Sequence, residues 1–174
     1  MGGELFRLPT AAAALRRAAS LITVSVLAAA LALAAIATSR AAEEDELYAA
    51  AERVADLYAM HEATEGEGGE TVLSGLALSR QFFHPVTAIA MQSRRLPLDP
   101  IYAGGTPPIT DIEIFPDTET GIHQGAGFVI VAFKASEEPH RLRYSLVKLG
   151  TDDTWWIIDI EGDDWSLKRL LIGR

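Results

Sequence analysis

The chain contains no cysteine, and it has few basic residues for its length. Without cysteine there is no disulfide and no thiol nucleophile, so a hydrophobic core must supply the stability. The 174 residues include 15 Lys or Arg and 24 Asp or Glu. Residues 1–41 carry four of these bases and one acid, so the remainder has a net charge of −12. Such an acidic domain repels nucleic-acid phosphates and anionic lipid, which excludes nucleic-acid binding.

The sequence also lacks the usual short motifs of catalysis and cofactor binding. The four histidines are dispersed, and none has a partner at the spacing of a zinc site. No serine lies in a Gly-x-Ser-x-Gly elbow. The stretch 61–70, HEATEGEGGE, could be a mobile loop that binds a cation, but it lacks the alternating acids of a calcium loop and is interpreted as a solvated linker. The sequence therefore predicts no metal site and no cofactor.

The first 41 residues are typical of a secretory signal peptide. A basic beginning with Arg7, Arg16 and Arg17 precedes sixteen uncharged residues, 21–36, and small residues follow around Ala41. We expect cleavage near Ala41 and a periplasmic or secreted domain, 42–174. The alternative is that residues 21–36 remain as an anchor in the inner membrane, which is then the domain's only membrane contact.

Two helical segments are expected to precede a sheet. Residues 43–60 open with acids, which suit a helix N-terminus, and then place Leu47, Val54 and Leu57 on one apolar stripe. Residues 71–96 are expected to form one or two helices, the second over 84–95 with Pro85 in its first turn. Four prolines between residues 96 and 108 exclude a helix there.

The second half of the chain predicts an antiparallel meander of four strands. The expected strands are 109–115, 123–133, 141–147 and 155–160, with the polar break 135–139 taken as a connection because its proline cannot donate to a ladder. A short helix over 166–171 closes the chain. Helices grouped before strands indicate an α+β fold, with the helices packed on one face of a curved antiparallel sheet.

The register of the last strand is open from the sequence. Trp156, Ile158 and Ile160 form the simpler inward set, because all three are apolar. A bulge near Asp159 would instead turn Trp155 inward. Either way the two adjacent tryptophans point to opposite faces of the strand.

The order and the motifs of these elements resemble the nuclear transport factor 2-like superfamily, a cone-shaped α+β fold, and within it the secreted bacterial members that form a domain of unknown function. The likeness covers roughly residues 45–171. The motifs that carry it are Phe82-Phe83, Leu98-Asp99-Pro100, Leu142 to Val147, Trp155 to Ile160 and Trp165-Ser166-Leu167. The loop that follows Asp99 lacks the Gln-Asp pair expected in such relatives, so no catalytic residue is transferred.

This resemblance implies that an activity, where one exists, lies inside the cone. Isomerases and dehydratases of the superfamily place an Asp or His there. Asp111 and Glu113 share one face of the strand 109–115 and are the candidate catalytic pair for a cofactor-free lyase or isomerase. The competing interpretation places both on an outer, solvated face, because Ile112 and Ile114 already supply the buried side.

The favoured hypothesis is an exported, non-enzymatic binding or interaction domain. Its partner is expected to be a small apolar ligand or another protein, and an exposed tryptophan would mark the surface used. The candidate binding residues are Tyr102, His123, Tyr144, Trp155 and Trp156. A third possibility is an immunity-type inhibitor, whose acidic surface suits a basic toxin.

Overall fold

The computed structural model describes residues 11–65, 69–105 and 107–173, with side chains from residue 38 onward. The chain forms two compact units, Met1–Ala42 and Glu43–Arg174. The side chains of residues 1–37, which are most of the expected signal peptide, lie outside the described part. Among the described residues, no helix has both the length and the apolar character needed to span a bilayer.

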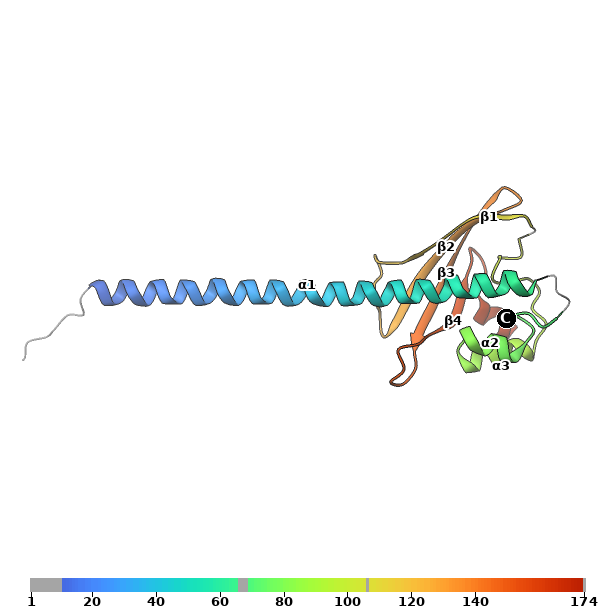
Figure 1. The fold of residues 1–174 in the computed structure, drawn as a ribbon, viewed down its shortest axis with the longest axis horizontal. Helices are drawn as coiled ribbons and strands as arrows, with labels where there is room; N and C mark the ends of the chain where they lie inside the picture. Colours follow the sequence, from blue (N-terminus) through green and yellow to red (C-terminus); the bar gives the residue numbers. More distant parts are fainter. Residues whose placement is uncertain (1–10, 66–68, 106, 174) are drawn as a thin grey trace, which may run out of the picture. The chain divides into compact units, whose positions relative to one another are not determined.

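The second unit is an α+β domain built around a four-stranded antiparallel sheet of strand order β1-β2-β3-β4, as the sequence predicts (Figure 1). The strands are β1 (Ile109–Pro116), β2 (Ala126–Ala135), β3 (Glu138–Lys148) and β4 (Trp155–Glu161). The helices are α1 (Ala11–Thr64), α2 (Leu76–Phe82), α3 (Pro85–Gln92) and α4 (Leu167–Ile172). The second half of α1 runs across one face of the sheet.

The apolar stripe of α1 is buried against the sheet, as its spacing predicts. Leu47, Val54 and Leu57 are almost inaccessible to solvent. Two expectations about this helix are wrong. It does not begin at the acids near residue 43, and it does not end at Met60 but continues to Thr64. His61 therefore lies on the helix, where it extends the same stripe by one turn.

The β2–β3 hairpin is tighter than the sequence suggests. Ser136 and Glu137 form a two-residue turn with φ values of 48° and 70°, which is the left-handed geometry of a type I′ hairpin. Pro139 was expected in the connection, but it lies in β3 opposite Lys134. Proline lacks a backbone N–H, but it is tolerated here because β4 pairs with β3 only from Arg143 to Lys148. The end of β3 that contains Pro139 therefore has no neighbouring strand on its β4 side to receive a hydrogen bond.

The preferred register of β4 is wrong, and a bulge is the reason. Ser145 pairs with Asp159 while Leu146 pairs with Ile157, so Ile158 is an extra residue in β4. This insertion allows Ile157 and Ile160 to face the core together. Trp155 is consequently buried and Trp156 is half-buried.

A second bulge overturns the expected alternation in β1. Thr110 pairs with Lys134 and Glu113 with Ala132, so two residues of β1 lie opposite one residue of β2. Asp111 has a φ of 55°, and Ile112 is 40% exposed rather than buried. Strand β2 begins at Ala126, three residues later than expected, and His123 only bridges to Ala126 in the turn before it.

The short helices close the β4 edge of the sheet. Between α2 and α3, Phe83 is fully buried and forms a parallel bridge with Ile157, and the His84 N–H donates to the Ile157 carbonyl at 2.8 Å. Pro85 opens α3, as predicted. The helix ends at Gln92, so the arginines expected in its last turn lie in the loop that follows.

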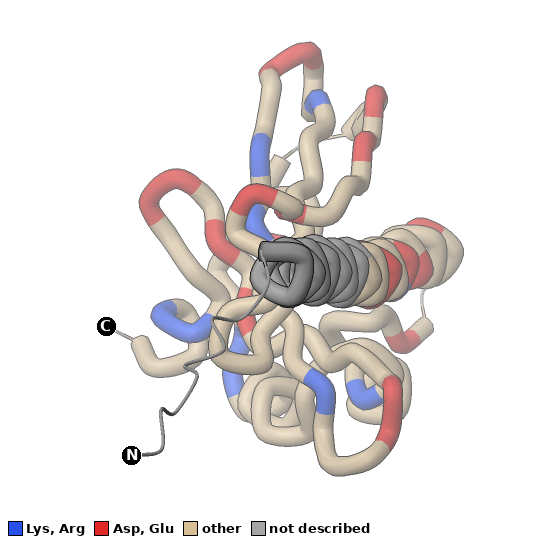
Figure 2. The backbone as a smooth tube through the Cα atoms, turned by 90° about the vertical axis from the view of Figure 1, so that its left-hand side faces the viewer, with Lys and Arg blue, Asp and Glu red and all other residues tan. Residues whose placement is uncertain are grey.

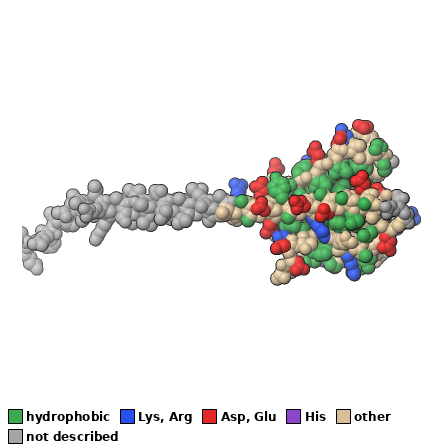
Figure 3. All heavy atoms as spheres, viewed as in Figure 1, with side chains coloured by type: hydrophobic (Ala, Val, Ile, Leu, Met, Phe, Trp, Pro, Cys, Tyr) green, Lys and Arg blue, Asp and Glu red, His purple; other side chains and the backbone are tan. Residues whose placement is uncertain are grey.

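Acidic residues are spread over the domain rather than gathered in one place. They occur in several turns and along α1 (Figure 2), and on the face in Figure 3 acidic side chains alternate with hydrophobic ones. The negative charge is therefore a property of the whole surface and does not by itself mark a binding site.

Candidate functional site

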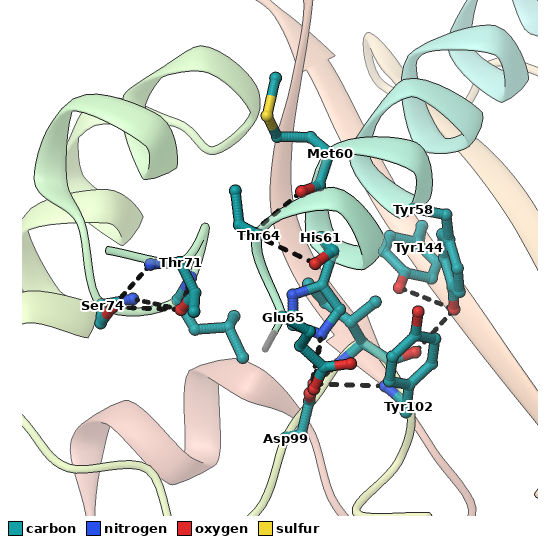
Figure 4. Close-up of polar contacts among 12 residues, drawn as sticks. Tyr58, Met60, His61, Thr64, Glu65, Thr71, Ser74, Asp99, Tyr102 and Tyr144 are labelled. Carbon is teal, nitrogen blue, oxygen red and sulfur yellow. Dashed lines mark hydrogen bonds and ion pairs between the residues drawn. The ribbon is translucent and has the colours of Figure 1, made fainter. Parts of the chain in front are cut away.

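A buried histidine in the last turns of α1 is the centre of the most polar part of the core. His61 is 1% exposed, and its Nε2 lies 2.8 Å from Oδ2 of Asp99. Glu65, one turn further along α1, places Oε1 3.8 Å from the same nitrogen. Figure 4 shows both helix side chains directed toward Asp99. His61 Nδ1 is buried and has no hydrogen-bond partner among the described residues.

Asp99 is positioned by its own backbone. Its Oδ1 accepts hydrogen bonds from the N–H groups of Ile101 at 2.7 Å and Tyr102 at 3.3 Å. This is the local turn that aspartate side chains favour, and it follows from the Leu-Asp-Pro sequence at residues 98–100. The turn leaves Oδ2 free to reach His61. Asp99 therefore joins two segments that are 38 residues apart.

Three tyrosines fill the core beside this pair. Tyr144 donates to the Tyr58 hydroxyl at 3.2 Å, and Tyr58 donates to the Ile101 carbonyl at 2.7 Å. The Tyr102 ring lies 5.8 Å from that of Tyr58, edge to face, and 5.0 Å from that of His61. All three tyrosines are buried. The interior between α1 and β3 is thus filled here by aromatic side chains.

Burial raises the pKa of all three tyrosines. The pKa of Tyr102 rises to about 12, first because of burial and then because Glu65, Glu62 and Asp99 place negative charge nearby. Burial also raises the pKa of Tyr58 and Tyr144 well above the ordinary value. Each of these phenols therefore keeps its proton in the folded state at a pH where the unfolded chain has lost it.

We expect the fold to lose stability steeply above a pH of about 10. The buried tyrosines contribute fully to the free energy of unfolding while the pH is below the pKa that they have in the unfolded chain. This contribution is lost as the pH rises through the pKa of the folded state, which is about 12 for Tyr102. Urea unfolding at pH values of about 8, 10 and 11 measures the effect, at up to ~1.4 kcal/mol per pH unit for each tyrosine. The Tyr102→Phe variant should have a shallower slope, and an unchanged slope would contradict this assignment.

An open groove of about 540 Å³ lies beside Asp99. It is formed by the residues just before α2, the end of α3 and the loop that runs from α3 to Asp99. Four lining residues are apolar: Leu73, Met91, Leu96 and Leu98. The remaining lining residues are Ser74, Gln92, Ser93, Arg94, Arg95 and Asp99. Neither arginine forms an ion pair with any other residue of the described ranges.

The candidate catalytic carboxylates lie far from this groove in the fold, on the edge strand β1. Asp111 is exposed and pairs with Lys134 at 2.7 Å, and Glu113 is also exposed. Neither lines a cavity among those described. A carboxylate in this position lacks the burial that would tune it as a general base.

The candidate binding residues are separated by the fold. Tyr102 and Tyr144 come together, but in the closed aromatic core rather than on a surface. His123 is exposed in the β1–β2 connection. Trp155 is 3% exposed, whereas Trp156 is half-buried with its ring 6.0 Å from the guanidinium of Arg53.

Sequence reasoning missed His61, Glu65 and the two groove arginines. A signal for His61 was present, because it follows Leu57 and Tyr58 at helical spacing and so continues the buried stripe. Glu65 then lies on the same helix face at i+4. The local sequence does not indicate that His61 and Glu65 contact Asp99, because that contact depends on how the loop 96–108 returns to α1.

Comparisons with family models, with characterised proteins and with solved structures found no match to this chain.

Proposed function

We propose that this chain is an exported, non-enzymatic binding domain, and that the groove beside Asp99 holds a small apolar ligand with an anionic end. One observation carries the proposal: a groove with both leucine and polar lining contains two arginines with no described ion-pair partner, in a domain whose net charge is strongly negative. The arginines would contact the anionic group, and Leu73, Met91 and Leu98 would contact the apolar part.

The dimensions and the chemistry of the groove agree with such a ligand. Its volume lies within the range of about 300–1,000 Å³ that small-molecule sites occupy. Arginine pairs with carboxylates through two parallel hydrogen bonds, which fixes the orientation of the bound group. In an acidic protein such a pair also makes the groove locally attractive to an anion.

Binding is preferred to catalysis because of where the polar groups lie. Asp111 and Glu113 are solvated on an edge strand, and the core between α1 and the sheet is filled by Tyr58, Tyr102 and Tyr144. A lyase or isomerase acting in the cone would need one of these groups to face a cavity. The proposed export rests on the pattern of residues 1–41, which is independent of the groove.

The proposal is tested by calorimetric titration of the full-length protein with dodecanoate. We expect binding at one site per chain, weakened about 10- to 100-fold in the Arg94→Gln/Arg95→Gln variant, because each charge-assisted hydrogen bond contributes ~1.5–3 kcal/mol. Arg80→Gln is the matched control, since Arg80 is exposed on α2 and outside the groove. Dodecanol should bind the wild type and the double variant equally. Absence of dodecanoate binding, or equal binding by the double variant, would contradict the proposal.

A further inference from the structure

The polar end of α1 has three potential metal ligands directed at one point. His61 Nε2, Glu65 Oε1 and Asp99 Oδ2 all lie within 4.8 Å of one another. Two come from one helix face at i and i+4, and the third comes from the fixed turn at Asp99 (Figure 4). The set therefore combines a nearly inaccessible imidazole, a partly buried carboxylate and an exposed one.

Two carboxylates compete for a single hydrogen-bond donor in this set. Two carboxylates approach the same imidazole nitrogen, yet that nitrogen carries at most one proton. The hydrogen bond from His61 Nε2 to Asp99 at 2.8 Å uses that proton. Glu65 therefore lies near the Asp99 carboxylate and receives no hydrogen bond from His61. The two carboxylates, whose ligand atoms lie within 4.8 Å of each other, repel, and together with Glu62 they place negative charge near Tyr102.

The distances fit coordination. A tetrahedral ion with bonds of about 2.1 Å separates its ligand atoms by about 3.4 Å. The two measured separations from Nε2, 2.8 Å and 3.8 Å, lie on either side of that value. To reach that value, His61 and Asp99 must separate by about 0.6 Å and the exposed Glu65 side chain must approach by about 0.4 Å.

We propose that His61, Glu65 and Asp99 form a binding site for a divalent transition metal, of which Zn²⁺ is the best fit. One imidazole with two carboxylates suits zinc, whereas calcium prefers six to eight oxygen ligands and does not favour a nitrogen. Three protein ligands leave one coordination position open. Asp99 also lines the groove, so the proposed metal site adjoins it.

This inference differs from the expectation drawn from the sequence. The dispersed histidines and the irregular acids of residues 61–70 predicted no metal site, because neither has the spacing of a known ligand motif. The structure forms the set from one histidine, its helical neighbour at i+4 and an aspartate 38 residues away from the histidine.

The test is equilibrium dialysis of untagged full-length protein against Zn²⁺, followed by elemental analysis. We expect one zinc ion per chain and a raised thermal unfolding midpoint in the wild type. Removing a side chain that only orients a metal ligand lowers metal affinity about 10- to 100-fold. Glu65 is proposed as a direct ligand, so Glu65→Gln should lower the affinity for zinc at least as much. Glu62→Gln is the matched control, because Glu62 lies on the same helix turn outside the ligand set.

Glu65→Gln is the decisive variant, because Glu65 is half-exposed and its loss should not disturb folding. Asp99→Asn keeps the Oδ1 acceptor of the turn and removes one charged ligand, so it should also lose zinc while its circular dichroism stays native. Unchanged zinc content in Glu65→Gln would overturn the proposal. So would a wild type that takes up no zinc, or one that takes up Ca²⁺ in preference to Zn²⁺.

Discussion

Replacing Phe83 with alanine is expected to lower the free energy of unfolding by about 3–5 kcal/mol, which would remove much of the stability of an ordinary domain. Phe83 is fully buried and joins the helical layer to the sheet edge through its bridge with Ile157. Truncation leaves a cavity at this junction, which rigid neighbours on both sides can fill only in part. Urea denaturation followed by circular dichroism measures the change.

Phe115→Ala is the matched control for this variant. Phe115 lies on the edge strand β1 and is 40% exposed, so its removal deletes the same atoms without opening an enclosed cavity. We expect a loss of at most about 1 kcal/mol, because substitutions away from the core have small effects. Similar losses in the two variants would show that the α2–α3 junction does not hold the sheet edge as described.

Replacing Asp99 with alanine is expected to cost about 2–4 kcal/mol, measured in the presence of a chelator so that bound metal plays no part. The carboxylate accepts from two backbone N–H groups and from His61 Nε2. Its loss leaves the buried Ile101 N–H and the buried imidazole without a partner, and each unsatisfied group carries a desolvation penalty. The backbone N–H of Tyr102 also loses its hydrogen bond to Asp99, so the position of Tyr102 should be less fixed.

Asp99→Asn separates the two roles of this side chain. The amide oxygen can still accept from Ile101 and Tyr102, while the amide nitrogen replaces the acceptor for His61. We therefore expect a loss intermediate between the wild type and Asp99→Ala. A full loss of stability in Asp99→Asn would mean that the His61 contact outweighs the turn. No loss in Asp99→Ala would mean that neither contact stabilises the fold.

Much of the fold could be predicted because the relevant signals are local. The stripe of Leu47, Val54 and Leu57 fixes the buried face of α1, and Pro85 fixes the start of α3. The alternation of Leu142, Tyr144 and Leu146 identifies the inner face of β3. These patterns depend only on the helical and strand periods, so one sequence is enough to recognise them.

The errors arise where one extra residue changes a strand. Bulges at Ile158 and around Asp111 reverse the side-chain alternation within β4 and β1, and neither has a glycine to indicate it. The predicted faces of Trp156 and Ile112 were wrong for this reason. A bulge is favoured by packing against the neighbouring strand and the helices, which the local sequence does not reveal.

The candidate site was harder to predict than the fold because its parts are remote in sequence. The motif at residues 98–100 indicated a turn but not what its carboxylate would reach. His61 was assigned to a linker because the glycines that follow it suggested an earlier helix end. Only the return of the loop 96–108 past α1 brings Asp99 to His61.

The bulge in β1 has a consequence for how copies of this protein meet. A strand at the rim of a sheet offers free backbone groups, and a neighbouring molecule can extend the sheet through them into an aggregate. On β1 that rim is interrupted by the left-handed Asp111, whose charge is paired with Lys134. At the opposite rim, Phe83 and His84 already occupy β4. Both rims are thus protected, and the left-handed backbone at Asp111 makes β1 a poor template for a strand of another molecule.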